Sequence, residues 1–338
     1  MKMRKLNALI ACAVLSFLFL TVPNAVMSIT LTYSNFFPPT HIQSILAEEW
    51  CKEVEKATNG EVKVQYYPGG TLTKAPQAYD GVVQGLSDLG FSVLAYSRGR
   101  FPVLGVVDLP MGYPSGVVAT QVANAVFEKF QPKEFDDVKV MYFHAHGPGL
   151  FFTADKPVRK LEDLKGLKLR ATGNAAKIVK AAGGTPVAMS MPDSYQSIQK
   201  GVVDGGVYPL ETNKGWRMAE VVDYGTAAFD IAYTTVFFVV MNKSKWEKLS
   251  KSSQQAIEAI NKEWIVKHGE AWDSSDTIGL RAFLDEGNDL IGLDEDEREK
   301  WKKAVSPIVD DYAKELDEKG LDGDAIVSFT KQTLKDLQ

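Results

Sequence analysis

The residue with the clearest possible chemistry in this sequence is Arg170, which ends the segment Leu167-Lys168-Leu169-Arg170. Apolar and basic residues alternate there with period two, a pattern typical of a β-strand that starts after a turn at Gly166. The strand stops just before a Gly173-Asn174 turn and a helical run, where open α/β sheets place their ligand crevice. A guanidinium there offers a permanently charged fork that matches a carboxylate. The same spacing is equally compatible with an arginine on a solvated surface.

Several predicted strands and helices alternate along the chain and would position this arginine. Alternating segments predict strands over 29–34, 61–68, 87–93, 138–144, 183–187 and 233–241, and helical spacing predicts helices over 42–58, 76–85, 175–182 and 192–200. The order strand, helix, strand at the start predicts a parallel pair, and therefore an α/β fold. Nearly everything after Lys245 is helical in period and charge.

The first residues have the layout of a secretory signal peptide. Lys2, Arg4 and Lys5 precede an apolar run from Ala8 to Val22, and small residues follow it. We expect cleavage after Ala25 or Ser28, so that residues 1–28 are removed and the mature protein reaches the periplasm. An uncleaved anchor is the alternative, although the apolar run falls short of the ~20 residues of a membrane span. Cys12 loosely fits a lipidation motif, but it comes too early, so we do not expect lipidation.

The 338 residues, 45% of them apolar, can form two domains or one large one, each with a core. Without residues 1–28 the chain has 35 basic and 43 acidic residues, a net charge of −8. Such a balance argues against a nucleic-acid-binding protein. Only Cys51 then remains, so no intramolecular disulfide can form.

The motifs of common enzymes are missing from this sequence. There is no G-x-S-x-G segment, no phosphate-binding loop and no paired-carboxylate motif in a fitting context. His144-Ala145-His146 would place two imidazoles on one face of a strand, but nothing nearby supplies a third metal ligand. We therefore expect no catalytic activity, no metal and no cofactor.

A series of short motifs resembles the substrate-binding proteins of tripartite ATP-independent periplasmic (TRAP) transporters over essentially the whole mature chain. These motifs are Thr58-Asn59-Gly60, Tyr67-Pro68-Gly69-Gly70-Thr71-Leu72, Gly85 with Ser87-Asp88, Val107-Asp108-Leu109-Pro110, Leu161 to Arg170, Gly184-Thr185-Pro186, and Gly201-Val202-Val203-Asp204-Gly205. Each is weak alone, but their order along the chain is specific.

The resemblance implies a two-lobed periplasmic binding protein with a cleft between the lobes and crossing hinge strands near Leu150 and Val236. Lobe I would comprise residues 29–150 and 237–278, and lobe II residues 151–236 and 279–338. A long helix around Glu247 to Glu270 would brace both lobes. The arginine that ends the corresponding strand pairs with the substrate carboxylate in that family, and here it is Arg170. We expect a monomer that hands its ligand to ion-driven membrane permease subunits.

Two departures from the family bear on the ligand. Gly147-Pro148-Gly149-Leu150 stands where many members carry a second arginine, and Gly206-Val207-Tyr208-Pro209 stands where many have Gln-Glu-Asn-Pro. Both changes remove polar recognition. The fold would direct a set of aromatic residues to the cleft: Phe37, Phe91, Tyr96, Phe143, Phe151, Tyr208 and Phe237. Candidate hydrogen-bonding groups are His144, Asn174, Glu211 and Asn213.

One guanidinium with aromatic surroundings matches a ligand with one carboxylate and a largely apolar body. We therefore predict an aromatic monocarboxylate. A branched aliphatic 2-oxo acid is the alternative ligand, and a sensory binding protein that presents its ligand to a receptor is the alternative role.

Overall fold

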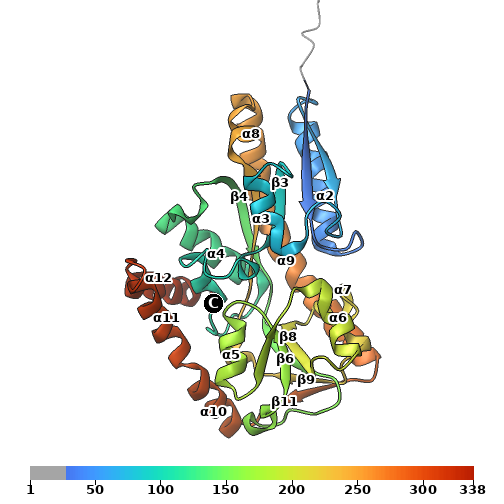
Figure 1. Ribbon diagram of the computed structural model, residues 1–338, viewed down its shortest axis with the longest axis vertical. Helices are drawn as coiled ribbons and strands as arrows, with labels where there is room; N and C mark the ends of the chain where they lie inside the picture. The colour runs from blue at the N-terminus through green and yellow to red at the C-terminus, as the bar shows by residue number, and fades with distance from the viewer. Residues whose placement is uncertain (1–27) are drawn as a thin grey trace, which may run out of the picture.

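The computed structural model describes residues 28–338, which form two lobes, each built on a β-sheet with helices against its faces (Figure 1). This arrangement confirms the predicted α/β, two-lobed fold. The predicted signal peptide falls almost entirely outside the described residues. Within residues 28–338, no helix combines the length and apolar character that crossing a bilayer requires.

The first lobe contains a five-stranded sheet in the order β2-β1-β3-β10-β4. Its strands are β1 (Ile29–Asn35), β2 (Val62–Tyr67), β3 (Leu89–Val93), β4 (Val138–Ala145) and β10 (Val236–Asn242). As the strand–helix–strand order predicts, β1 and β2 are parallel. Strand β10 returns from the other lobe and lies antiparallel between β3 and β4, so it is a crossing strand.

The second lobe contains a six-stranded sheet in the order β11-β9-β5-β8-β6-β7. Its strands are β5 (Gly149–Thr153), β6 (Lys168–Ala171), β7 (Thr185–Ala188), β8 (Gly205–Pro209), β9 (Tyr224–Ala227) and β11 (Asp289–Gly292). Strand β6 is parallel to β7 and β8, so Arg170 leaves the sheet at its carboxyl edge, as predicted. Strand β11 interrupts the C-terminal region that was expected to be nearly all helical.

The helices are α2 (Ile42–Ala57), α3 (Ala78–Val83), α4 (Gly116–Phe130), α5 (Ala175–Ala181), α6 (Met191–Gln199), α7 (Thr212–Gly215), α8 (Lys243–Glu247), α9 (Lys251–Asp285), α10 (Glu295–Val305), α11 (Pro307–Asp317) and α12 (Gly323–Asp336). Local sequence explains their ends. His41 caps α2 through a side-chain nitrogen that accepts from the Gln43 backbone N–H, and Ser250 caps α9 in the same way from Ser253.

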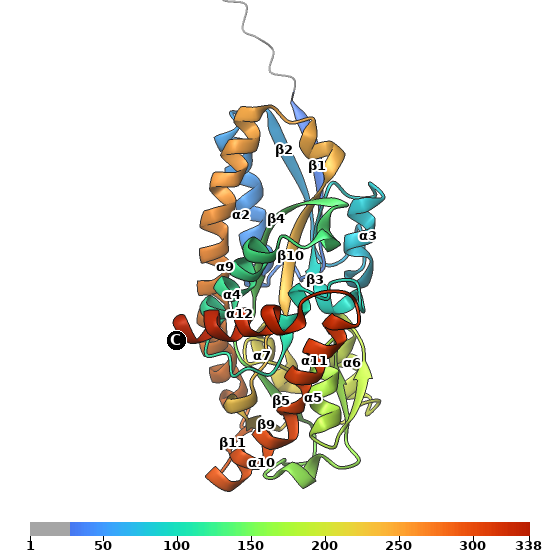
Figure 2. The ribbon, with the colours of Figure 1, turned by 90° about the vertical axis from the view of Figure 1, so that its left-hand side faces the viewer.

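Helix α9 is 35 residues long and runs along both lobes (Figure 2). Two carboxylates of α9 accept hydrogen bonds from the backbone, one from each lobe. Asp273 accepts hydrogen bonds from the Gly116 and Val117 backbone N–H groups at the start of α4, in the first lobe. Oδ1 of Asp276 accepts from the backbone N–H of Glu211 in the second lobe, at 2.8 Å. The predicted bracing helix therefore exists, and it extends further than expected.

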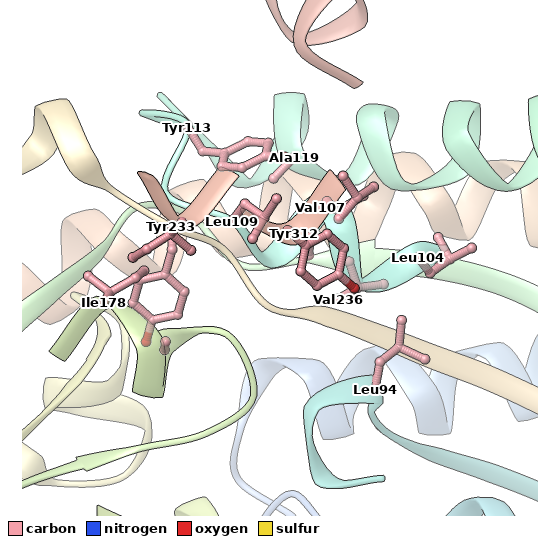
Figure 3. Packing of buried hydrophobic residues seen from close by; sticks show 14 of the residues in the cluster. Leu94, Leu104, Val107, Leu109, Tyr113, Ala119, Ile178, Tyr233, Val236 and Tyr312 are labelled. Atoms are coloured by element: carbon pink, nitrogen blue, oxygen red, sulfur yellow. The ribbon is translucent and has the colours of Figure 1, made fainter. Parts of the chain in front are cut away.

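One hydrophobic cluster is shared by both lobes. Figure 3 shows Leu94, Leu104 and Val107 of the first lobe in the same cluster as Ile178 of α5 and Tyr312 of α11. Helix α12 also packs against α4, so the C-terminal segment contacts the first lobe. The predicted residue division between the lobes stays a prediction, since the C-terminal helices contact both.

The lobes touch where Gly173 meets Ala95. A Cβ atom at position 173 would lie 2.8 Å from the Cβ of Ala95, and the backbone φ of Gly173 is +52°. Both the close approach and the left-handed backbone favour glycine here.

Candidate ligand-binding site

A cavity with about 430 Å³ of empty space lies between the lobes, at the ends of the strands. Phe36 and Phe37 follow β1, Val93 ends β3, and Arg170 and Tyr208 lie near the ends of β6 and β8. Parallel strands that end at one edge thus bring residues distant in sequence to one place.

Arg170 is only 5% exposed and lines this cavity. Its Nε donates to the carbonyl of Met189 at 3.2 Å, and its Nη1 donates to the carbonyl of Val207 at 3.3 Å. No carboxylate within residues 28–338 forms an ion pair with it. A buried charge without a counter-charge is costly unless something supplies one. The remaining N–H donors of the guanidinium therefore suit an anion in the cavity.

Three tyrosines share the cavity with Arg170. Burial raises the pKa of Tyr96, Tyr208 and Tyr233, and the Arg170 cation partly opposes each rise. All three hydroxyls therefore keep their protons. The Tyr96 oxygen accepts from the Met191 backbone N–H at 2.9 Å, across the lobes. The Tyr208 hydroxyl is buried with no hydrogen-bond partner in the described part of the chain. These groups can donate to oxygen atoms of a bound acid.

A group of aromatic rings also lines the cavity. Phe36 stacks on Phe37 with ring centroids 4.4 Å apart, and Trp216 of the second lobe lies 6.0 Å from Phe36 at an interplanar angle of 19°. Phe237 and Trp272 continue the group, 5.0 Å apart. Flat rings arranged in this way offer faces and edges against which an aromatic or branched apolar body packs.

Glu211 also lines the cavity, but both of its carboxylate oxygens are engaged. Nδ1 of His41 accepts from the Gln43 backbone N–H, so Nε2 carries a proton and donates to Oε2 of Glu211 at 3.0 Å. The Thr212 hydroxyl donates to Oε1 at 3.0 Å. His41 belongs to the first lobe and Glu211 to the second, so this buried contact also joins the lobes.

Six of the residues predicted to bind ligand line the cavity. They are Phe37, Tyr96, Arg170, Tyr208, Glu211 and Phe237. Their position is consistent with the prediction, and their contact with a ligand stays a prediction.

The other predicted residues lie outside the cavity lining. Phe91 lies behind Phe37, at 5.5 Å between ring centroids. His144 stacks on Phe237 and accepts a hydrogen bond from Trp272. Phe151 faces away, against Trp301, and Phe143 packs on Phe127 and Phe135. Asn174 donates to the Gly105 carbonyl at 2.8 Å, and Asn213 is buried in α7. These side chains do not line the cavity and are not part of the proposed site, although the amide of Asn213 is buried without a hydrogen-bond partner in residues 28–338.

Sequence reasoning missed several residues that line the cavity. Phe36 was recognisable as part of an aromatic cluster after the first strand. Trp216 directly follows α7 and Trp272 lies in α9, two helices whose packing no local pattern reveals, and His146 lies in the loop after β4. No group of three or more His, Cys, Asp or Glu residues in 28–338 is placed to hold a metal ion.

Residues 33–315 match a known family, described as DctP: bacterial extracellular solute-binding protein, family 7. A TRAP periplasmic solute-binding protein from Desulfovibrio salexigens is 34% identical, with a TM-score of 0.80, over 91% of this chain and 96% of that one. A marine-metagenome TRAP solute-binding protein specific for aromatic acid ligands, crystallised with 3-hydroxybenzoate, is 29% identical with a TM-score of 0.87, over 92% and 99%.

The C4-dicarboxylate-binding periplasmic protein DctP of Rhodobacter capsulatus is 26% identical over 93% of this chain and 95% of its own length. Relatives over nearly the whole chain therefore include binding proteins for chemically different acids. The family match over most of the chain, together with a two-lobed fold of the same kind, shows that this chain belongs to the family 7 solute-binding proteins of TRAP transporters.

Proposed function

We propose that this protein captures an organic monocarboxylate, with an aromatic acid as the preferred ligand, and delivers it to TRAP permease subunits. It does so in the periplasm, as a monomer and without catalysing a reaction, after an N-terminal signal peptide has been removed. Arg170 binds the carboxylate, and the rings of the first lobe with Trp216 cover the body of the ligand.

The observation that carries this proposal is a buried guanidinium that has no carboxylate partner within residues 28–338 and lies beside a wall of aromatic rings. In the described part of the chain, Arg170 is the only Arg or Lys that lines the cavity. One cation matches one carboxylate, whereas a dicarboxylate would leave its second charge desolvated against apolar rings. The relative from the marine metagenome, which is specific for aromatic acids, supports the same choice.

Two alternatives remain within this proposal. A branched aliphatic 2-oxo acid would also place one carboxylate on Arg170 and an apolar body on the rings. A sensory protein would need the same cavity and the same closure, and would differ only in the membrane partner that receives the closed form.

A thermal-shift screen of residues 29–338 tests the ligand class. The panel contains benzoate, 3-hydroxybenzoate, mandelate, 4-methyl-2-oxopentanoate, succinate and glucuronate. A ligand at about 100 times its dissociation constant adds roughly 2.7 kcal/mol to stability, which raises the midpoint by several degrees. We expect the aromatic acids to give the largest rise. A rise with succinate or glucuronate alone would overturn the proposal, and a larger rise with the branched 2-oxo acid would select the alternative.

A further inference from the structure

His146 is a cavity residue to which the carboxylate-binding argument gives no role. It follows β4 in the first lobe and is 4% exposed. Its ring lies edge-on to Tyr233, with centroids 5.6 Å apart, and 6.3 Å from both Phe237 and Trp272. The Thr234 hydroxyl donates to its backbone carbonyl at 2.6 Å. The imidazole is therefore held in one place, at the edge of the ring-lined wall.

The neighbouring backbone fixes which nitrogen of His146 carries the proton. Nδ1 lies 2.6 Å from the carbonyl oxygen of Gly147. A carbonyl oxygen can only accept, so Nδ1 is the N–H donor and Nε2 of the neutral ring has a bare lone pair. A Cβ atom at position 147 would lie 2.0 Å from Oδ2 of Asp276, so any other residue there would require Asp276 to move. Glycine thus keeps this carbonyl where it faces the ring.

The ring stays neutral under ordinary conditions. Burial lowers the pKa of His146 to about 4, the Gly147 carbonyl opposes this, and the Arg170 cation adds to the lowering. Above about pH 5.5 Nε2 is therefore a hydrogen-bond acceptor and not a donor. Within residues 28–338 no group donates to Nε2, and this nitrogen, unlike Nε2 of His144, is not fully enclosed, so it is free to accept from a molecule in the cavity.

Resting on the function proposed above, we infer that Nε2 of His146 accepts a hydrogen bond from a hydroxyl group on the bound carboxylate. Arg170 can only donate to the ligand, whereas Nε2 of the neutral His146 ring can only accept, so the two side chains complement each other. A hydroxy acid satisfies both kinds of group. A 2-oxo acid offers His146 only another lone pair, and the deoxy acid offers it nothing. The site therefore selects hydroxylated aromatic acids over their unsubstituted counterparts.

Isothermal titration calorimetry at pH 7 with two matched pairs tests this inference. The pairs are 3-hydroxybenzoate with benzoate and mandelate with phenylacetate. One net hydrogen bond predicts that wild type binds the hydroxy acid about tenfold more tightly in at least one pair. His146→Leu removes the acceptor at similar size and should bring that ratio to about one, while the affinity for the deoxy acid changes little. His146→Gln, whose side-chain oxygen can also accept, should retain part of the preference.

The outcomes separate this inference from the function on which it rests. If wild type binds both members of each pair equally well, or if His146→Leu keeps the preference, the inference is wrong and the proposed function stands. If none of the four acids binds, the proposed function fails, and the inference fails with it.

A second measurement does not depend on the variants folding. The chain has only four histidines, so ¹⁵N-histidine labelling of the wild-type protein gives a simple spectrum. The Nε2 resonance of His146 should move toward the hydrogen-bonded position with the preferred hydroxy acid and not with its deoxy counterpart. An Nε2 resonance that responds identically to both acids would contradict the inference.

Discussion

The two walls of the cavity offer different kinds of contact. The first lobe contributes mainly rings, from Phe36 and Phe37 after β1 and from Phe237 of β10. The second lobe contributes the guanidinium of Arg170 and the hydroxyl of Tyr208. A ligand therefore finds its charge partner on the second lobe and most of its apolar partners on the first, with Trp216 of the second lobe completing the set of rings. The full set of contacts requires both lobes together.

Several contacts between the lobes surround the cavity. The Tyr96 hydroxyl reaches the Met191 backbone, His41 pairs with Glu211, and the Asn174 amide donates to the Gly105 carbonyl. The structure thus has the lobes in contact, and the cavity is assembled. The difference between the walls can be tested by changing one wall at a time.

The largest effect should follow from removing the guanidinium. We expect Arg170→Ala to weaken binding of the preferred acid at least 100-fold, because uncompensated loss of a buried charge partner costs about 3–5 kcal/mol. Arg170→Lys keeps the charge but not the planar fork, so its affinity should lie in between. Titration calorimetry measures both. Arg281→Ala, at an exposed position on α9, makes the same charge change as a control and should bind as wild type does. Equal affinity of Arg170→Ala and wild type would contradict the proposed role.

A smaller effect should follow from removing Trp216. This ring closes over Phe36 from the second lobe and is only half-buried, so Trp216→Ala should fold. An aromatic contact contributes about 0.5–1.5 kcal/mol beyond its area, which predicts a roughly tenfold loss for benzoate or 3-hydroxybenzoate. Trp216→Phe should keep most of the affinity. Calorimetry compares the loss of affinity in Trp216→Ala with that in Trp216→Phe, and the difference gives the contribution of the aromatic ring. An equal loss of affinity in both variants would mean that ring stacking does not contribute to binding.

The smallest expected effect concerns the stability of the fold and a buried acid of the first lobe, Asp108. Burial raises the pKa of Asp108 to about 8, although its Oδ1 accepts from the Val236 backbone N–H at 2.9 Å. The folded state therefore binds a proton that the unfolded state has lost above about pH 4. The stability from this group is complete below that pH and is lost as pH rises toward 8.

The side chain introduced by Asp108→Asn cannot ionise, so the variant should show a weaker pH dependence of the free energy of unfolding. Between pH 5.5 and 7.5 we expect wild type to lose about 1 kcal/mol or more relative to the variant. Urea unfolding at both pH values measures the difference. Parallel losses in the two proteins would show that Asp108 is ionised in the folded state as readily as in the unfolded one.

Sequence patterns predicted the five strands of the first sheet and its parallel start, strands β6 and β7, and the place of Arg170, because strand alternation and turn residues are local signals. They did not predict β5, β9 or β11. The patterns also did not predict which position along a strand reaches the cavity. Phe91 and His144 were expected in the cleft, yet Val93 and His146, two residues later on the same face, line the cavity. Alternation gives the face of a side chain, but only the sheet shows how far each strand extends.

The remaining differences come from tertiary packing. Phe151 lies on the face of β5 that Trp301 covers, whereas its neighbour Phe152 stacks on Tyr208. Nothing within that strand marks which face meets the ligand, since both are apolar. Trp216 and Trp272 reach the cavity from helices that are distant in sequence, and their positions depend on how α7 packs on α9.

The two α9 carboxylates that accept hydrogen bonds from different lobes also affect how the cavity can open. Asp273 and Asp276 are three residues apart, so the anchor points of the two lobes are separated by about 4.5 Å along the helix axis. The helical turn that carries both anchors therefore restricts relative motion of the lobes close to α9. We expect the parts of the cavity farthest from α9 to separate most when the lobes open.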